Sequence, residues 1–293
     1  MKWHNGTWIY YEFKIVSCTI AYLPKKIGYL IAHFVADIIY LLSPALRAAV
    51  ADNMKHVLGA AVDKAALKQA VRGVFRNAAK NYFDLVKVPH MKLAEIEQSI
   101  TVHGWDNFEA ALNRGKGVIV ITAHLGSFDM AAQMIAARSV KAMVLIEPLE
   151  PKPLLDYIIN VRGSKGVAIV PLQFGALKVV LQSLRRGEVV LLACDRDIGN
   201  DGLKAPFFGR ETRIPAGAAR LAMRTGAAVV PAFNLRHSDG RYVIFIEPAL
   251  EITPSGNDAL ANNMRKIVAV MEKYIRLSPE QWVVLRPVWR NEH

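Results

Sequence analysis

One short segment pairs a histidine with a carboxylate at a spacing that suits proton transfer. His124 and Asp129 lie five positions apart, just after a run of apolar residues at 118–122. Near neutral pH an imidazole can take a proton from an alcohol, and a carboxylate bonded to the other ring nitrogen fixes the tautomer and stabilises the imidazolium. The pair predicts attack by a substrate hydroxyl. The chain lacks the Gly-x-Ser-x-Gly elbow that would place a serine nucleophile.

Spacing alone does not single out His124, because His90 also precedes an acidic residue, Glu95, by five positions. His90 follows a basic amphipathic stretch rather than a strand, so we interpret it as a surface residue. The structural alternative for His124 is a histidine that caps a buried turn. Zinc binding is disfavoured, since the sequence places no second histidine or cysteine at motif distance, and we predict no metal site.

The elements around this pair follow an alternating pattern from residue 101 onward. We expect strands at 118–122, 142–146, 167–170, 189–193, 227–233 and 242–247, and helices at 127–138, 151–162, 175–187, 216–226 and 257–277. This alternation predicts an α/β fold with a mixed, largely parallel sheet flanked by helices on both faces. In such sheets ligands bind beyond the carboxyl ends of the strands, which is where His124 would lie.

Other polar residues follow expected strands and would lie at the same edge of the sheet. Glu147 ends the strand at 142–146 and would contact either an acceptor hydroxyl or a neighbouring cation. Asp195, Arg196 and Asp197 follow the strand at 189–193. Either one of these two carboxylates supports His124, or the three residues form a local salt-bridge cluster.

The N-terminal part of the chain is strongly apolar between residues 8 and 43, with an interruption at Pro24, Lys25 and Lys26. The run is short and carries polar residues, so we expect a helix that lies at a membrane interface rather than one that spans it. The alternative is a helix packed on the core. A basic amphipathic helix is expected at 64–88. We predict a membrane-associated segment at 1–60 and an α/β domain at 61–293.

Composition agrees with a membrane-bound protein. The 293 residues are 53% hydrophobic and carry a formal net charge of +12, which favours anionic partners. The sequence shows no zinc-finger, helix-turn-helix or aromatic RNA-binding pattern, so anionic lipid is the expected partner rather than nucleic acid. Two cysteines are too few for a disulfide framework and fit a reduced, cytosolic environment.

Several motifs beyond the His124 segment resemble those of the lysophospholipid acyltransferase superfamily. The branch of lipid A late acyltransferases and phosphatidylinositol mannoside acyltransferases is the most similar. The resemblance rests on Asp52-Asn53-Met-Lys-His-Val-Leu58, Val74-Phe-Arg-Asn-Ala-Ala-Lys-Asn-Tyr82, Asp195-Arg-Asp-Ile-Gly199, Pro206-Phe-Phe-Gly-Arg210, Arg213-Ile-Pro-Ala-Gly217 and Pro279-Glu-Gln-Trp282. Lipid A enzymes usually carry Glu at the second catalytic position, so Asp129 favours the mannoside branch.

The resemblance implies an O-acyltransferase that needs no cofactor. It also implies that the enzyme acts at the cytoplasmic face of the inner membrane. The acyl donor would be acyl coenzyme A or acyl carrier protein, and the acceptor a hydroxyl of a glycolipid or phosphorylated lipid. The rival within this class is glycerolipid acylation, although the Phe-Pro-Glu-Gly-Thr block of that branch is missing here. The non-enzymatic rival is a membrane-binding scaffold, which would not need both His124 and Asp129.

The resemblance also assigns roles to residues outside the central pair. Arg162 matches a family arginine that binds acceptor phosphate, with a surface helix-end arginine as the alternative. The loop at 206–210 would offer Phe207 and Phe208 to the acyl chain, with a packed position in the core as the alternative for two adjacent phenylalanines. Arg210 or Arg213 would contact a phosphate. Backbone amides of the turn at 124–127 would stabilise the oxyanion.

Overall fold

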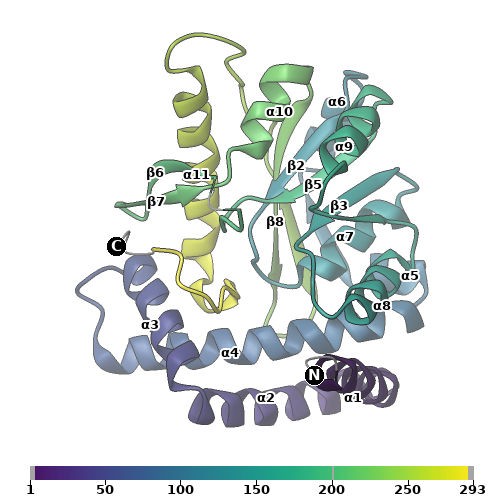
Figure 1. Cartoon of the computed structure of the whole chain (residues 1–293), viewed down its shortest axis with the longest axis vertical. Helices are drawn as coiled ribbons and strands as arrows, with labels where there is room; N and C mark the ends of the chain where they lie inside the picture. The colour runs from purple at the N-terminus through teal and green to yellow at the C-terminus, as the bar shows by residue number, and fades with distance from the viewer. Residues whose placement is uncertain (1–3, 200, 290–293) are drawn as a thin grey trace.

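A seven-stranded sheet forms the centre of the protein, as the computed structural model in Figure 1 shows. Residues 4–199 and 201–289 are described, so the outer ends of the two predicted domains (residues 1–3 and 290–293) and residue 200 lie outside this description. The sheet order is β1-β9-β8-β2-β5-β3-β4. Its strands are β1 (Ile100–His103), β2 (Val118–Thr122), β3 (Ala142–Ile146), β4 (Ala168–Pro171), β5 (Val189–Ala193), β8 (Ala228–Arg236) and β9 (Tyr242–Ile246).

The strand pairing confirms the largely parallel sheet. β8 and β9 run antiparallel, whereas the other neighbouring pairs are parallel. β2 lies between β5 and β8, and its residues 118–121 are all buried. Ile119 and Ile121 contribute to one hydrophobic cluster, and Val118 and Val120 to another. A continuous apolar run is expected for a strand that is covered on both faces.

Helices cover both faces of this sheet (Figure 1). One cluster joins the sheet to α3, α4, α9, α10 and α11, and the other joins it to α5, α6 and α7. The bounds are α1 (His4–Ile20), α2 (Lys25–Leu42), α3 (Pro44–Leu58), α4 (Lys64–Lys87), α5 (Leu93–Gln98), α6 (Trp105–Leu112), α7 (Phe128–Ala137), α8 (Lys152–Gly163), α9 (Ala176–Arg185), α10 (Gly217–Thr225) and α11 (Ala259–Leu277).

A hairpin of β6 (Leu203–Phe207) and β7 (Arg210–Ile214) replaces the loop expected at 206–210. The two residues of its turn, Phe208 and Gly209, have φ values of 49° and 77°. Such a turn needs positive φ at both positions, and phenylalanine seldom adopts it. The sequence therefore carries no ordinary signal for this hairpin.

The helix α2, in the N-terminal part of the chain, has one buried face and one exposed face. Gly28, Ala32 and Ala36 are buried, and a Cβ atom at Gly28 would lie 2.0 Å from the Phe83 ring of α4. Leu30 and Phe34 point outward and are 70% and 68% exposed. Thus α2 packs on the domain with one face and leaves an apolar face uncovered. Figure 1 shows α4 passing below the end of β8, with α2 running alongside it.

Within the described residues, no individual helix combines the length and apolar character that membrane crossing requires. The consecutive helices α2 and α3 meet this requirement only as a pair, and the chain bends by 99° between them.

Candidate active site

His124 lies in the turn that joins β2 to α7, beyond the carboxyl end of β2 as predicted. Gly126 has a φ of 60°, and a Cβ atom at this position would lie 2.3 Å from the backbone oxygen of Asn234. Glycine is therefore required both for the conformation of the turn and for its close approach to β8. The turn brings the imidazole, 25% exposed, to the edge of the sheet.

Asp195 supports the His124 ring. Its Oδ1 lies 2.8 Å from His124 Nδ1, and its Oδ2 accepts hydrogen bonds from the His124 backbone N–H at 2.9 Å and the Trp282 indole N–H at 2.7 Å. Burial raises the pKa of this fully buried carboxyl, but the charge of His124 and the three hydrogen bonds outweigh that effect and hold the pKa below its usual range. The carboxylate fixes Nδ1 as the protonated ring nitrogen, which leaves Nε2 to act as a base.

The predicted hydrogen bond between Asp129 and His124 is wrong. Arg162 Nε donates to Asp129 Oδ1 at 2.6 Å, and Arg162 Nη2 donates to Oδ2 at 3.3 Å. Asp129 belongs to the first turn of α7, and its carboxylate is directed toward the guanidinium of α8. His124 instead meets Asp195, because Thr122 of β2 pairs with Ala193 of β5 two positions earlier on each strand. The Arg162 guanidinium forms an ion pair with Asp129 in this structure, and its contact with an acceptor phosphate stays a prediction.

The other polar residues at the sheet edge have structural partners. Arg196 Nη2 donates to Glu147 at 2.5 Å, so Glu147 forms the ion pair that was one of its two interpretations. Asp197 accepts a hydrogen bond from the Gly202 backbone N–H at 3.1 Å and orders its own loop. Among these residues, Asp195 is the carboxylate that supports His124.

The hairpin residues predicted to contact acyl chain and phosphate are placed elsewhere. Phe207 is fully buried, stacks on Trp289 and belongs to the core on the face opposite the pocket described below, so its predicted exposure to an acyl chain is wrong. Phe208 is held by its backbone N–H, which donates to Glu272 at 2.6 Å, and its ring lies against Trp282. Arg210 contacts His56 and Arg213 contacts the Gly202 carbonyl, and their phosphate roles stay predictions.

The backbone amides of the turn are already engaged, which corrects the predicted oxyanion site. His124 N–H donates to Asp195, Leu125 N–H to the Ala123 carbonyl, and Gly126 N–H to the Gln281 carbonyl. Ser127 N–H donates to Asn234 Oδ1 at 3.0 Å. These four bonds hold the turn rigidly, but they leave none of its amides to receive a developing negative charge.

An apolar pocket opens beside His124. The Phe128 ring lines it and packs edge-on against the His124 ring, with 5.4 Å between the ring centroids. The empty space in the pocket, including its opening to solvent, is about 570 Å³. The pocket runs between α7, α6 and the sheet, and is lined by Val102, Trp105, Phe108, Val120, Thr122, Phe128, Ala131, Met134, Ile135, Leu191, Ala232, Phe233, Asn234, Ile244 and Ile246. Its apolar lining suits a hydrocarbon chain.

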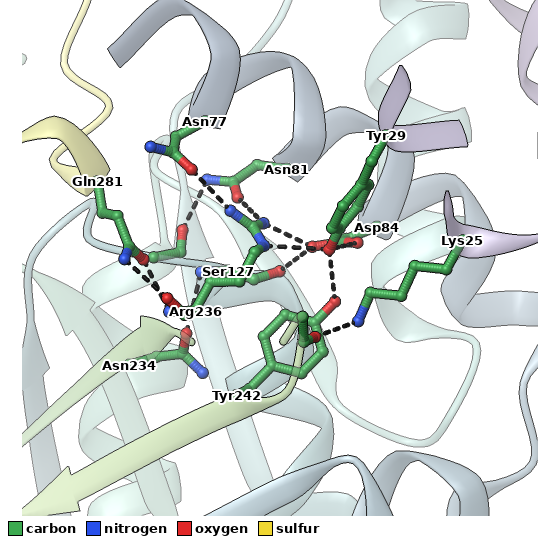
Figure 2. A network of polar contacts seen from close by, with 12 residues as sticks. Lys25, Tyr29, Asn77, Asn81, Asp84, Ser127, Asn234, Arg236, Tyr242 and Gln281 are labelled. Carbon is green, nitrogen blue, oxygen red and sulfur yellow. Dashed lines mark hydrogen bonds and ion pairs between the residues drawn. The ribbon is translucent and has the colours of Figure 1, made fainter. Parts of the chain in front are cut away.

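A buried polar network lies beneath the turn and ties it to the N-terminal helices (Figure 2). Arg236, at the end of β8, donates to Asp84 of α4 at 2.6 Å, and the two side chains are 3% and 2% exposed. Asp84 also accepts a hydrogen bond from Ser127 Oγ at 2.8 Å, and Asn81 Nδ2 donates to the Gly126 carbonyl at 2.6 Å. Two bonds of this network thus end on the turn that carries His124.

The network reaches α2 through Tyr29, whose hydroxyl donates to Asp84 at 2.9 Å and accepts from Arg236 Nε at 3.0 Å. Burial lowers the pKa of Arg236, but the charge of Asp84 more than compensates, so the pKa is raised and the guanidinium stays charged. Sequence reasoning missed this pair. The signal was weak: Asp84 is a charged residue inside the apolar stretch 83–86, and Arg236 directly follows the largely apolar stretch 227–235.

Comparison with known proteins decides the family. A model described as bacterial lipid A biosynthesis acyltransferase matches residues 3–291. The chain belongs to this family. The resemblance predicted from the motifs is therefore confirmed.

Members of this acyltransferase family with similar sequences come from both expected branches. A phosphatidylinositol mannoside acyltransferase of Mycobacterium tuberculosis is 32% identical over 213 residues, which cover 72% of this chain and 66% of that protein. The corresponding enzyme of Mycolicibacterium smegmatis is 28% identical, over 75% of this chain and 72% of its own length. A lipid A biosynthesis palmitoleoyltransferase of Escherichia coli is 27% identical, over 65% and 61%. The chain thus spans just under two thirds of the first of these relatives.

Proposed function

We propose that the protein is an O-acyltransferase that moves a fatty acyl group from a thioester to a hydroxyl of a glycolipid or phosphorylated lipid. The observation that carries this proposal is the His124–Asp195 pair beside an apolar pocket, next to the pocket-lining residue Phe128. The relatives named above are acyltransferases, which supports the same chemistry. The donor would be acyl coenzyme A or acyl carrier protein, and the residues described provide the acid–base chemistry without a cofactor.

The reaction follows from the protonation state that Asp195 imposes. With Nδ1 protonated, His124 Nε2 takes the proton of the acceptor hydroxyl while its oxygen attacks the thioester carbonyl carbon. The carbonyl electron pair moves onto oxygen, and the C–S bond breaks when the carbonyl reforms. His124 then returns the proton to the leaving thiolate. Asp195 stabilises the imidazolium between these two transfers.

The proposal is tested by transfer of radiolabelled acyl groups from acyl coenzyme A and from acyl carrier protein to a panel of lipids. The panel includes phosphatidylinositol mannosides, lipid A precursors and lysophosphatidic acid. We expect one lipid class to be labelled by the wild type and not by His124→Ala, which should retain the wild-type unfolding midpoint. Labelling that survives in His124→Ala would refute the mechanism. If the wild type shows no labelling and no thioester hydrolysis with either donor, the result would favour a membrane-binding scaffold.

We expect the pocket to determine which acyl chain lengths the protein accepts. Phe128 and Ala131 lie one turn apart on α7 and both line the pocket, so Ala131 is one turn along the pocket wall from the residue that contacts His124. We expect Ala131→Leu to fill the pocket there and lower kcat/KM for long-chain donors at least about tenfold relative to short-chain donors, since overpacking costs about 1–3 kcal/mol. Competition between acyl donors of different length measures this ratio. Ala136→Leu, on the same helix but outside the pocket lining, is the control.

We expect the uncovered apolar face of α2 to bind membranes, and the formal net charge of +12 favours anionic lipid there. The family resemblance implies that this membrane surface is the cytoplasmic face of the inner membrane. Leu30 and Phe34 are one turn apart and largely exposed. We expect Leu30→Glu/Phe34→Glu to weaken binding to vesicles of phosphatidylglycerol and phosphatidylcholine by at least about 100-fold, because each buried apolar side chain contributes about 1.5–3 kcal/mol. Sedimentation with vesicles measures this. Leu277→Glu removes an equally exposed leucine from α11 and should have little effect.

A further inference from the structure

Asn234 has a buried side-chain amide whose oxygen accepts a hydrogen bond, whereas its nitrogen has no partner among the described residues. It lies on β8, is 2% exposed, and lines the apolar pocket. Its Oδ1 accepts the Ser127 backbone N–H at 3.0 Å. Among the described residues, its Nδ2 has no hydrogen-bond partner. A buried donor without a partner costs roughly 1–3 kcal/mol, so such a donor in the lining of a pocket calls for an explanation.

The orientation of this amide is fixed by its neighbour. A backbone N–H only donates, so the oxygen of Asn234 must face Ser127 and the nitrogen must face the other way. Figure 2 shows the nitrogen directed away from Arg236 and without a dashed contact. The arrangement is rigid, because Gly126 touches the Asn234 backbone and Gln281 bonds both the N–H and the carbonyl of Arg236.

The same pocket contains the thioester in the proposed reaction. Phe128 lines the pocket and packs against the His124 ring, and Asn234 lines the same pocket and bonds Ser127 of the same turn. In the proposed reaction, the carbonyl that is attacked beside His124 therefore lies near Asn234. The four backbone amides of the turn are engaged elsewhere, as described above. Within the described pocket lining, Asn234 Nδ2 is therefore the buried side-chain donor that has no partner.

We propose that Asn234 Nδ2 donates a hydrogen bond to the carbonyl oxygen of the bound acyl thioester and stabilises the oxyanion. This inference rests on the proposed acyl transfer. As the acceptor oxygen forms its bond to the carbonyl carbon, the carbonyl pair moves onto oxygen and the negative charge grows beside the Asn234 N–H. When the C–S bond breaks, the pair returns to reform the carbonyl. A fixed donor in a water-poor pocket favours the charged state over the neutral carbonyl.

Two variants separate this role from simple support of the turn. Asn234→Asp keeps the acceptor for Ser127 N–H but loses the donor, whereas Asn234→Ala loses both. Removing one oxyanion donor typically lowers kcat by about 10²–10³-fold. We therefore expect both variants to lose about that much in kcat, with KM for acyl coenzyme A changed less than about threefold. If Asn234 only holds the turn, Asn234→Asp stays within twofold of the wild type, and the inference is overturned.

Asn263→Asp is the matched control, because Asn263 is a fully buried amide bonded to the Thr253 backbone on the far side of the core. It measures what the same substitution does to stability and should leave kcat unchanged. His124→Ala belongs in the same assay. Histidine-dependent transfer that Asn234→Asp retains would overturn the role of Asn234 alone, whereas no histidine-dependent transfer by the wild type would overturn the proposed function and this inference together.

A second measurement keeps Asn234 intact and does not need a folded Asn234 variant. Acyl coenzyme A with a ¹³C-labelled thioester carbonyl is bound to His124→Ala, and the carbonyl stretch is followed by infrared difference spectroscopy. A hydrogen bond to the bound carbonyl moves this band to lower frequency than in an apolar solvent. We expect that shift, and an unshifted band would overturn the proposal.

Discussion

Asp195→Asn is expected to lower kcat by about 10³–10⁴-fold while the protein remains folded. The asparagine amide can place a donor opposite His124 Nδ1, which selects the wrong tautomer and removes the charge that stabilises the imidazolium. The loss should appear in kcat rather than in KM for the acyl donor, because Asp195 is buried and reaches the substrate only through His124. Steady-state kinetics with a fixed acceptor measure both parameters.

Two controls sharpen this prediction. Asp197→Asn changes the same residue type two positions later, where the carboxylate bonds the loop at Gly202, and should cost less than about tenfold. Asp129→Asn tests the carboxylate that the sequence motif favoured but that the structure pairs with Arg162. A larger loss in Asp129→Asn than in Asp195→Asn would mean that the partner of His124 during turnover differs from the one in this structure.

Breaking the buried pair of Arg236 and Asp84 is expected to cost about 3–5 kcal/mol of unfolding free energy, because one charge is left without its partner inside the protein. We expect this cost for Asp84→Asn and for Arg236→Met. The double variant should lose clearly less than the sum of the single losses, since it leaves no buried charge uncompensated. Urea unfolding of the four proteins gives the cycle.

The control for the cycle is Asp37→Asn, which breaks ion pairs between α2 and the Arg72 and Arg76 side chains of α4 at the protein surface. Its loss should be much smaller, because solvent screens exposed pairs. Equal losses at Asp37 and Asp84 would contradict the argument from burial. Since Asp84 also bonds Ser127, its substitution should lower kcat as well, and Asp37→Asn should not.

The sheet and its main helices could be predicted because their signals are local. The apolar run of β2 occupies the predicted residues, and β3 and β5 also match their expected ranges. β1 and the β6–β7 hairpin were missed for a physical reason. β1 has four residues with polar side chains among them, and the hairpin turn depends on a phenylalanine at positive φ.

In the candidate site too, features with a local sequence signal could be predicted, whereas features that depend on distant contacts could not. The sequence by itself determined that His124 stands at the carboxyl end of a buried strand, because an apolar run followed by a glycine-containing turn is a local pattern. It could not determine which carboxylate meets the imidazole. Asp129 is near in sequence but turns with α7 toward Arg162, whereas Asp195 is 71 residues away and becomes the neighbour because β2 and β5 pair in register.

Tertiary structure alone also decided the supports of the site. Asp84, Asn234, Arg236 and Trp282 come from three separate segments, α4, β8 and the C-terminal segment. The contacts of Asp84 and Asn234 with the turn, of Trp282 with Asp195 and of Arg236 with Asp84 arise only when these segments pack together. The sequence specifies each residue type but not which distant side chain completes its hydrogen bonds. Burial then makes that completion obligatory, because an unpaired charge in the core would cost several kcal/mol.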